Sequence, residues 1–103
     1  MSDLPAVTRR VNDQGLVEYR VAAVSDWDGF DSLVAYLQKH WQGQVSESVD
    51  DIYSRRWVVR VERTPISICH DSQIGNYFLR EDSVADQDLL ERIAADLTQR
   101  LSQ

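Results

Sequence analysis

The hydrophobic pattern at the start of the chain predicts a β-hairpin followed by a helix. In residues 6–24, two β-rich stretches flank the cluster Asn12-Asp13-Gln14-Gly15, and a glycine in such a turn takes positive φ without steric cost. Ser25 or Asp26 is a candidate N-cap, and Gly43 a candidate C-terminal stop, for a helix over residues 26–41. Apolar side chains recur there at three- and four-residue steps, namely Trp27, Phe30, Leu33, Val34, Leu37 and Trp41.

The middle of the chain changes to a period of two, which is typical of strands. Residues 44–51 are polar and indicate either an edge strand or an extended link. In the following strand, Trp57, Val59 and Val61 alternate with Arg56, Val58, Arg60 and Glu62. Residues 66–70 and 76–80 read as two further strands joined by a glycine-containing turn. We therefore expect a three-stranded meander over residues 55–80.

A second helix is expected near residues 86–101, with Ser83 or Asp86 as its N-cap. Its apolar stripe consists of Leu89, Leu90, Ile93, Leu97 and Leu101. The elements predict one α+β domain over residues 1–103, with a flexible tail at residues 1–5. We expect a two-layer sandwich in the order ββαβββα, in which both helices pack on one face of an antiparallel sheet. The other face can stay open to solvent.

Composition narrows the classes of protein. The 103 residues carry a net charge of -6, which disfavours nucleic acid as a partner, and include one cysteine and two histidines. One cysteine forms no internal disulfide, and a four-ligand zinc site would need added carboxylates, so we predict neither metal nor cofactor. The chain has no apolar run of about 20 residues for a membrane span and no secretory h-region. These features predict a cytoplasmic protein without membrane contact.

The triplet Cys69-His70-Asp71 has the residue types of a nucleophile, a base and an orienting acid. Neighbours on a strand point to opposite faces, so Cys69 and His70 are not expected to meet. His70 is predicted to be a hydrogen-bonded residue at the margin of the core, and a dyad of Cys69 with His40 is the remaining alternative. No phosphate-binding, hydrolase or metalloprotease motif occurs in the sequence. We therefore assign no catalytic residue, and we predict that the three tryptophans belong to the core.

Side-chain alternation also predicts a candidate binding face. If Trp57, Val59, Val61, Ile66, Ile68, Tyr77 and Leu79 point inward, the opposite face carries a mixture of arginine and apolar residues. Such a mixture is favoured at protein interfaces. The candidate partner-binding residues are Arg56, Val58, Arg60, Cys69, Phe78 and Arg80. The alternative is a solvated face on which these arginines pair with Glu62 or Glu81.

Three segments, "DDIYSRRWVVRVERTPISI", "NYFLR" and "DLLERIAADL", resemble a family of small proteins of unknown function found mainly in gamma-proteobacteria. The resemblance covers residues 26–101 and implies a fold and a lineage, without a catalytic residue. It leaves open whether the first hairpin joins the main sheet. The functional hypothesis is a non-enzymatic protein-interaction module, immunity-like or regulator-like, that binds a protein partner or a second copy. The alternative is a small enzyme or ligand-binding domain with an unidentified site.

Overall fold

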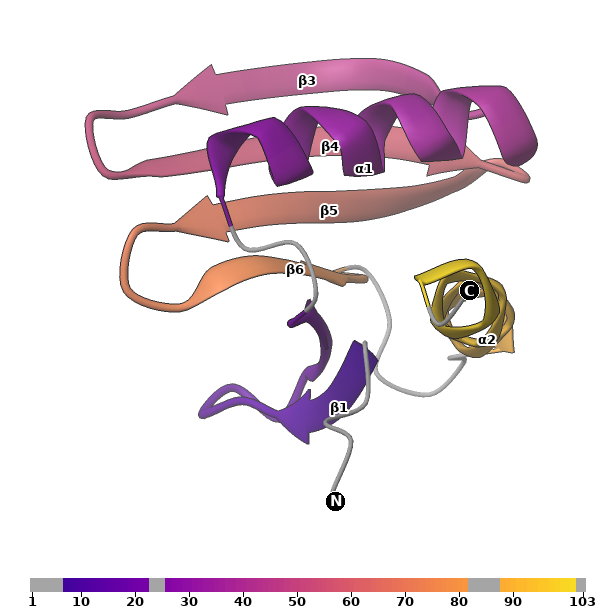
Figure 1. Ribbon diagram of the computed structural model, residues 1–103, viewed down its shortest axis with the longest axis horizontal. Coiled ribbons are helices and arrows are strands. Elements are labelled where there is room, and N and C mark those ends of the chain that lie inside the picture. Colours follow the sequence, from indigo (N-terminus) through magenta and orange to yellow (C-terminus); the bar gives the residue numbers. More distant parts are fainter. Residues whose placement is uncertain (1–6, 23–25, 82–87, 102–103) are drawn as a thin grey trace.

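The computed structural model describes residues 7–22, 26–81 and 88–101. Six strands form one antiparallel sheet in the order β1-β2-β6-β5-β4-β3. Both helices lie on one face of the sheet, with α1 in front of β4 and α2 beside the β1 end (Figure 1). The elements are β1 Val7–Val11, β2 Val17–Val21, α1 Trp27–His40, β3 Gln44–Asp50, β4 Ser54–Val61, β5 Thr64–Asp71, β6 Gly75–Leu79 and α2 Asp88–Leu101.

The structure confirms the predicted α+β class, the antiparallel sheet and the placement of both helices on one face. For residues 44–51 the sequence indicated either an edge strand or an extended link. They contain the edge strand β3, which pairs with β4. The first hairpin joins the main sheet through β2, which pairs with β6. The predicted tail at residues 1–5 and the candidate caps Ser25, Ser83 and Asp86 lie outside the described residues.

Helix α1 begins and ends through specific backbone contacts. The Asp26 carboxylate accepts a hydrogen bond from the Gly29 N–H at 2.7 Å, which satisfies a free donor of the first turn. After the helix, Gln42 takes a φ of 54° and the Gly43 N–H donates to the Leu37 carbonyl. The left-handed residue that ends the helix is therefore Gln42, and the predicted stop, Gly43, is the residue after it. A Cβ on Gly43 would lie 2.6 Å from Val59 Cγ1, so glycine allows the link to approach the sheet.

The core lies between the helices and one face of the sheet. Trp57, Val59 and Val61 pair across β4 and β5 with Ile68, Ile66 and Thr64, so these residues share the helix-covered face. Phe30, Leu33, Val34 and Leu37 of α1 and Leu89, Leu90, Ile93 and Leu97 of α2 pack against this layer. Because all of these side chains leave water together, their burial is the main stabilising contribution of the domain.

The predicted orientation of β6 is wrong. Phe78 pairs with Ile68 and with Tyr19, so it points into the core and stacks on the Tyr19 ring at a centroid distance of 5.3 Å. Tyr77 and Leu79 therefore face the helix-free side. The physical reason is that apolar side chains occupy both faces of this strand, so alternation alone does not choose between them. The choice comes from the turn, which pairs Asp71 with Gly75.

The prediction that all three tryptophans belong to the core is wrong for Trp27. Trp41 and Trp57 are partly buried against the core, whereas Trp27 is 38% exposed at the start of α1. The Trp27 ring lies against His70, and the Arg55 guanidinium lies 4.5 Å from the ring centroid. Trp27 thus covers a polar corner at one end of the sheet, where aromatic faces attract cations.

Candidate functional site on the helix-free face

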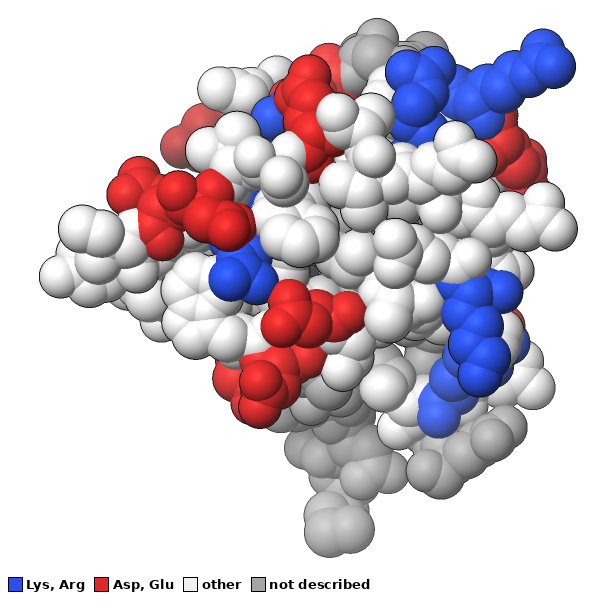
Figure 2. Space-filling view, turned by 90° about the horizontal axis from the view of Figure 1, so that it is seen from above, with Lys and Arg blue, Asp and Glu red and all other residues white. Residues whose placement is uncertain are grey.

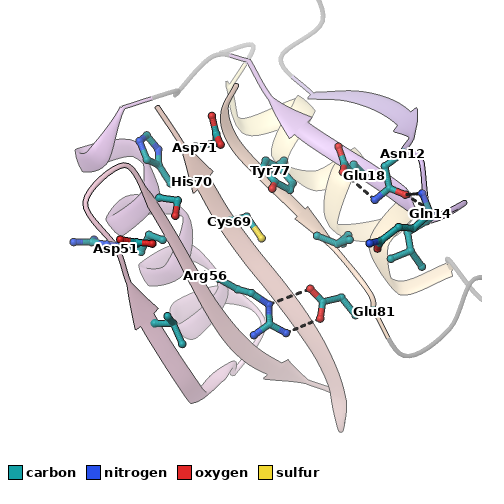
Figure 3. Close-up of a pocket in the computed structure, with 15 residues that line it drawn as sticks. Asn12, Gln14, Glu18, Asp51, Arg56, Cys69, His70, Asp71, Tyr77 and Glu81 are labelled. Atoms are coloured by element: carbon teal, nitrogen blue, oxygen red, sulfur yellow. Dashed lines mark hydrogen bonds and ion pairs between the residues drawn. The ribbon is translucent and has the colours of Figure 1, made fainter. Parts of the chain in front are cut away.

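The helix-free face of the sheet contains an open depression of about 410 Å³. Cys69 of β5 and Tyr77 and Leu79 of β6 lie on its floor, because antiparallel partners project to the same face. Glu18 of β2 and Arg56 of β4 border it from the two sides (Figure 3). A second depression of about 280 Å³ on this face is lined by Glu47, Arg56, Val58, Pro65, Ser67 and Glu81.

A two-pronged ion pair borders both depressions. Arg56 Nε donates to Glu81 Oε1 at 3.0 Å and Nη2 to Oε2 at 2.6 Å, as Figure 3 shows. The hydrogen bonds from Arg56 lower the pKa of the Glu81 carboxyl. On the other side of the guanidinium, Glu47 Oε2 lies 3.6 Å from Arg56 Nη1. Arg56 therefore has its fork occupied and holds a fixed position on the face.

The thiol on the floor is protonated at neutral pH. Burial raises the pKa of Cys69 to about 11, although the hydrogen bond with Tyr77 acts in the opposite direction. The pKa of Tyr77 is also raised, mainly by burial and to a smaller extent by the neighbouring Cys69. Because the thiolate is the nucleophilic form of cysteine and a base must be deprotonated, neither side chain has the ionisation that base or nucleophilic work would require here.

The histidines lie on the other side of the sheet from the thiol. His70 Nδ1 lies 2.7 Å from Asn76 Oδ1, and the imidazole ring packs against Trp27 at a centroid distance of 4.4 Å. This arrangement confirms the prediction of a hydrogen-bonded residue at the core margin. His40 ends α1 and packs on Tyr36, so it too lies in the helix layer. Neither the local dyad nor the dyad with His40 is formed.

The structure brings four of the six predicted partner-binding residues to the helix-free face. Arg56, Val58, Arg60 and Cys69 lie there, with Arg60 exposed and Val58 and Cys69 each only 7% exposed. Phe78 was wrongly assigned to this face, because it lies in the core. Arg80 follows β6 and is partly buried. Only part of the predicted apolar centre is therefore available to a partner.

Sequence reasoning missed the side chains that replace Phe78 on this face. Tyr77 and Leu79 were placed inward, and Glu18 was not considered because the first hairpin had no assigned place in the sheet. The only sequence signal for Glu18 is its polar position in the alternating stretch Val17-Glu18-Tyr19. Its place at the depression follows from the pairing of β2 with β6.

Within the described ranges, no three histidine, cysteine or acidic side chains lie close enough together to hold a metal ion. The same ranges contain no helix that is long and apolar enough to cross a membrane. No protein-family model matches the chain, and neither a curated protein nor a solved structure is found similar to it. The resemblance to the gamma-proteobacterial family therefore stays a prediction.

Proposed function

We propose that this chain is a protein-interaction module that binds its partner through the helix-free sheet face. The observation that carries the proposal is the uncovered face itself, where the fixed Arg56–Glu81 pair lies among half-buried and apolar side chains. Interfaces favour arginine and aromatic residues beside apolar area. An immunity-like or regulator-like role is the biological setting that fits an acidic binder of this size.

A binding role is favoured over nucleophilic or base catalysis by the state of the polar groups on this face. The raised pKa values of Cys69 and Tyr77 keep both side chains protonated, and the carboxylate of Glu81 is bound by Arg56.

The depression of about 410 Å³ supports a second candidate, a small-ligand-binding domain. A cytoplasmic location remains part of the proposal, in agreement with the free thiol of Cys69.

The test uses one charge reversal on the face and one on the helix layer. Arg60 is exposed on the helix-free face, and Lys39 is exposed in the last turn of α1. Both Arg60→Glu and Lys39→Glu change the net charge equally. We expect a partner captured from the native cell by the wild-type chain to be lost with Arg60→Glu and retained with Lys39→Glu. Equal capture by both variants, with unchanged circular dichroism, would place binding elsewhere.

The ligand-binding alternative has a separate readout. Titration of the purified chain with a library of small metabolites, followed by thermal denaturation, detects any compound that binds the folded state. A compound whose stabilising effect disappears in Tyr77→Phe, but persists in Lys39→Glu, would favour the ligand-binding domain. The hydroxyl of Tyr77 is the test atom because it lies at the floor of the depression (Figure 3).

A further inference from the structure

The sheet has two free edges that run in opposite directions. β1 forms one edge and β3 the other, and within the described ranges no strand pairs with the outer side of either. Because all neighbours are antiparallel and the strand number is even, β1 and β3 point in opposite directions. A second copy in the same orientation would therefore place its β1 antiparallel to β3, with the helices of both copies on the same face.

The two edges carry charges of opposite sign. In β1, Arg9 and Arg10 are exposed and no acidic residue occurs. In β3, all seven residues are exposed, and the charged ones are Glu47 and Asp50. Figure 2 looks onto the β3 side of the molecule, where acidic side chains gather toward the left and most basic ones toward the right. The acidic end is the one toward which β3 runs in Figure 1.

We propose that copies of this chain associate edge to edge, with β3 of one copy pairing antiparallel with β1 of the next. Residues 47–50 are the part of β3 that suits this pairing, since the irregularity between Val45 and Glu47 ends before them. Their exposed backbone forms the unpaired row of donors and acceptors that an added strand requires. This inference uses the edges of the sheet and does not depend on the proposed helix-free binding face.

Two registers match both the charges and the faces, one with Arg10 opposite Glu47 and one with Arg9 opposite Asp50. Placing Arg10 opposite Glu47 puts two helix-free-face residues together, because Arg10 pairs with Glu18 and Glu47 with Val58 inside each copy. The same register places Arg9 opposite Ser48 on the helix-covered face, diagonal to Asp50. Glu47 is the less engaged acid, since its one contact, with Arg56, is 3.6 Å long, whereas Asp50 contacts Arg55 at 3.1 Å and Trp57 at 2.8 Å. We therefore choose the register that places Arg10 opposite Glu47.

The same charges disfavour the pairing of two identical edges. Pairing β3 with β3 brings carboxylates together, and pairing β1 with β1 brings guanidinium groups together, which destabilises a strand pair. The interface is therefore heterologous, and an open assembly of any length keeps one free β3 edge and one free β1 edge. Such an interface produces open chains or rings, so we expect weak, concentration-dependent growth beyond the dimer.

Charge exchange tests the pairing directly. Sedimentation of the full chain, from about 10 µM to about 1 mM as suits a short edge contact, should show an average mass that rises above 11.9 kDa. Glu47→Arg or Arg10→Glu alone should weaken association by about fivefold or more, because each places like charges opposite one another. An equal mixture of these two variants should associate again, since each β3 then faces a complementary β1.

The double variant and two controls complete the experiment. Glu47→Arg combined with Arg10→Glu should associate as the wild type does, whereas a β3–β3 contact would give no such recovery. Lys39→Glu should leave association unchanged, and circular dichroism should show that every variant is folded. A wild-type chain that stays monomeric at about 1 mM, or single variants that associate as strongly as the wild type, would overturn the proposal. Loss of partner capture with Arg60→Glu would leave the edge proposal untouched.

Discussion

At the residue scale, Gly43 is required by close packing. A Cβ there would lie 2.6 Å from Val59 Cγ1 and 3.1 Å from the Leu37 carbonyl oxygen, and Val59 is fully buried. We expect Gly43→Ala to lower the free energy of unfolding by about 1–3 kcal/mol, as overpacking in a filled core does. Urea denaturation measures this loss. The double variant Gly43→Ala with Val59→Ala should lose less than the sum of the single changes, and strict additivity would contradict the contact.

The buried thiol predicts a loss of stability at alkaline pH. The pKa of Cys69 rises on folding from 9.0 to about 11, so the folded state binds the thiol proton more tightly than the unfolded state. This contribution is fully present below pH 9 and disappears as the pH rises toward 11. It corresponds to about 2–3 kcal/mol. Urea denaturation between pH 8 and 11 should show the decline, and Cys69→Ala should reduce it. The decline that remains comes from Tyr19, Tyr36 and Tyr77, whose pKa values are also raised in the folded state.

At the element scale, the Asp26 cap determines where α1 begins. Its carboxylate accepts from the Gly29 N–H, and its carbonyl accepts from Asn76 Nδ2 at 3.0 Å. Asp26→Ala removes only the side-chain bond and should cost about 1 kcal/mol of stability, whereas Asp26→Ser should retain most of it. Thermal denaturation distinguishes the two variants. Asp28→Ala is the matched control, since it removes a first-turn acid without removing the cap. Equal losses for all three would contradict the cap assignment.

The elements differ in how far the sequence determines them. Helix α1 was predictable because its apolar stripe and its cap agree, and the observed bounds lie within one residue of the prediction. The face of β6 was not predictable, because Tyr77, Phe78 and Leu79 are all apolar enough for either side. Which face each side chain of β6 takes depends on the length of the turn between Asp71 and Gly75. One residue more or less in this turn would exchange the two faces.

At the scale of the whole molecule, the candidate site needed long-range pairing that no local pattern contains. Glu18 and Arg56 come from distant segments and border one depression only because β2 joins the sheet beside β6. The sequence determined the outward arginines of β4, since the alternation around Trp57 is unambiguous. It offered Glu62 or Glu81 as the partner of these arginines, and Arg56 is held by Glu81, which follows the last strand. The face and its candidate acids were thus predictable, and the choice of Glu81 over Glu62 as the partner of Arg56 was not.

The strand order predicts a gradient of backbone protection across the molecule. β5 lies between β4 and β6, and residues 66–70 are buried, so its amides should open only with global unfolding. β3 is exposed along its whole length, and its outward amides should exchange fastest among the strands. Hydrogen exchange measured at low protein concentration tests this order, and β3 amides as protected as those of β5 would contradict it. Because edge pairing covers β3 and β1 together, raising the concentration should increase protection at these two strands and leave β5 unchanged.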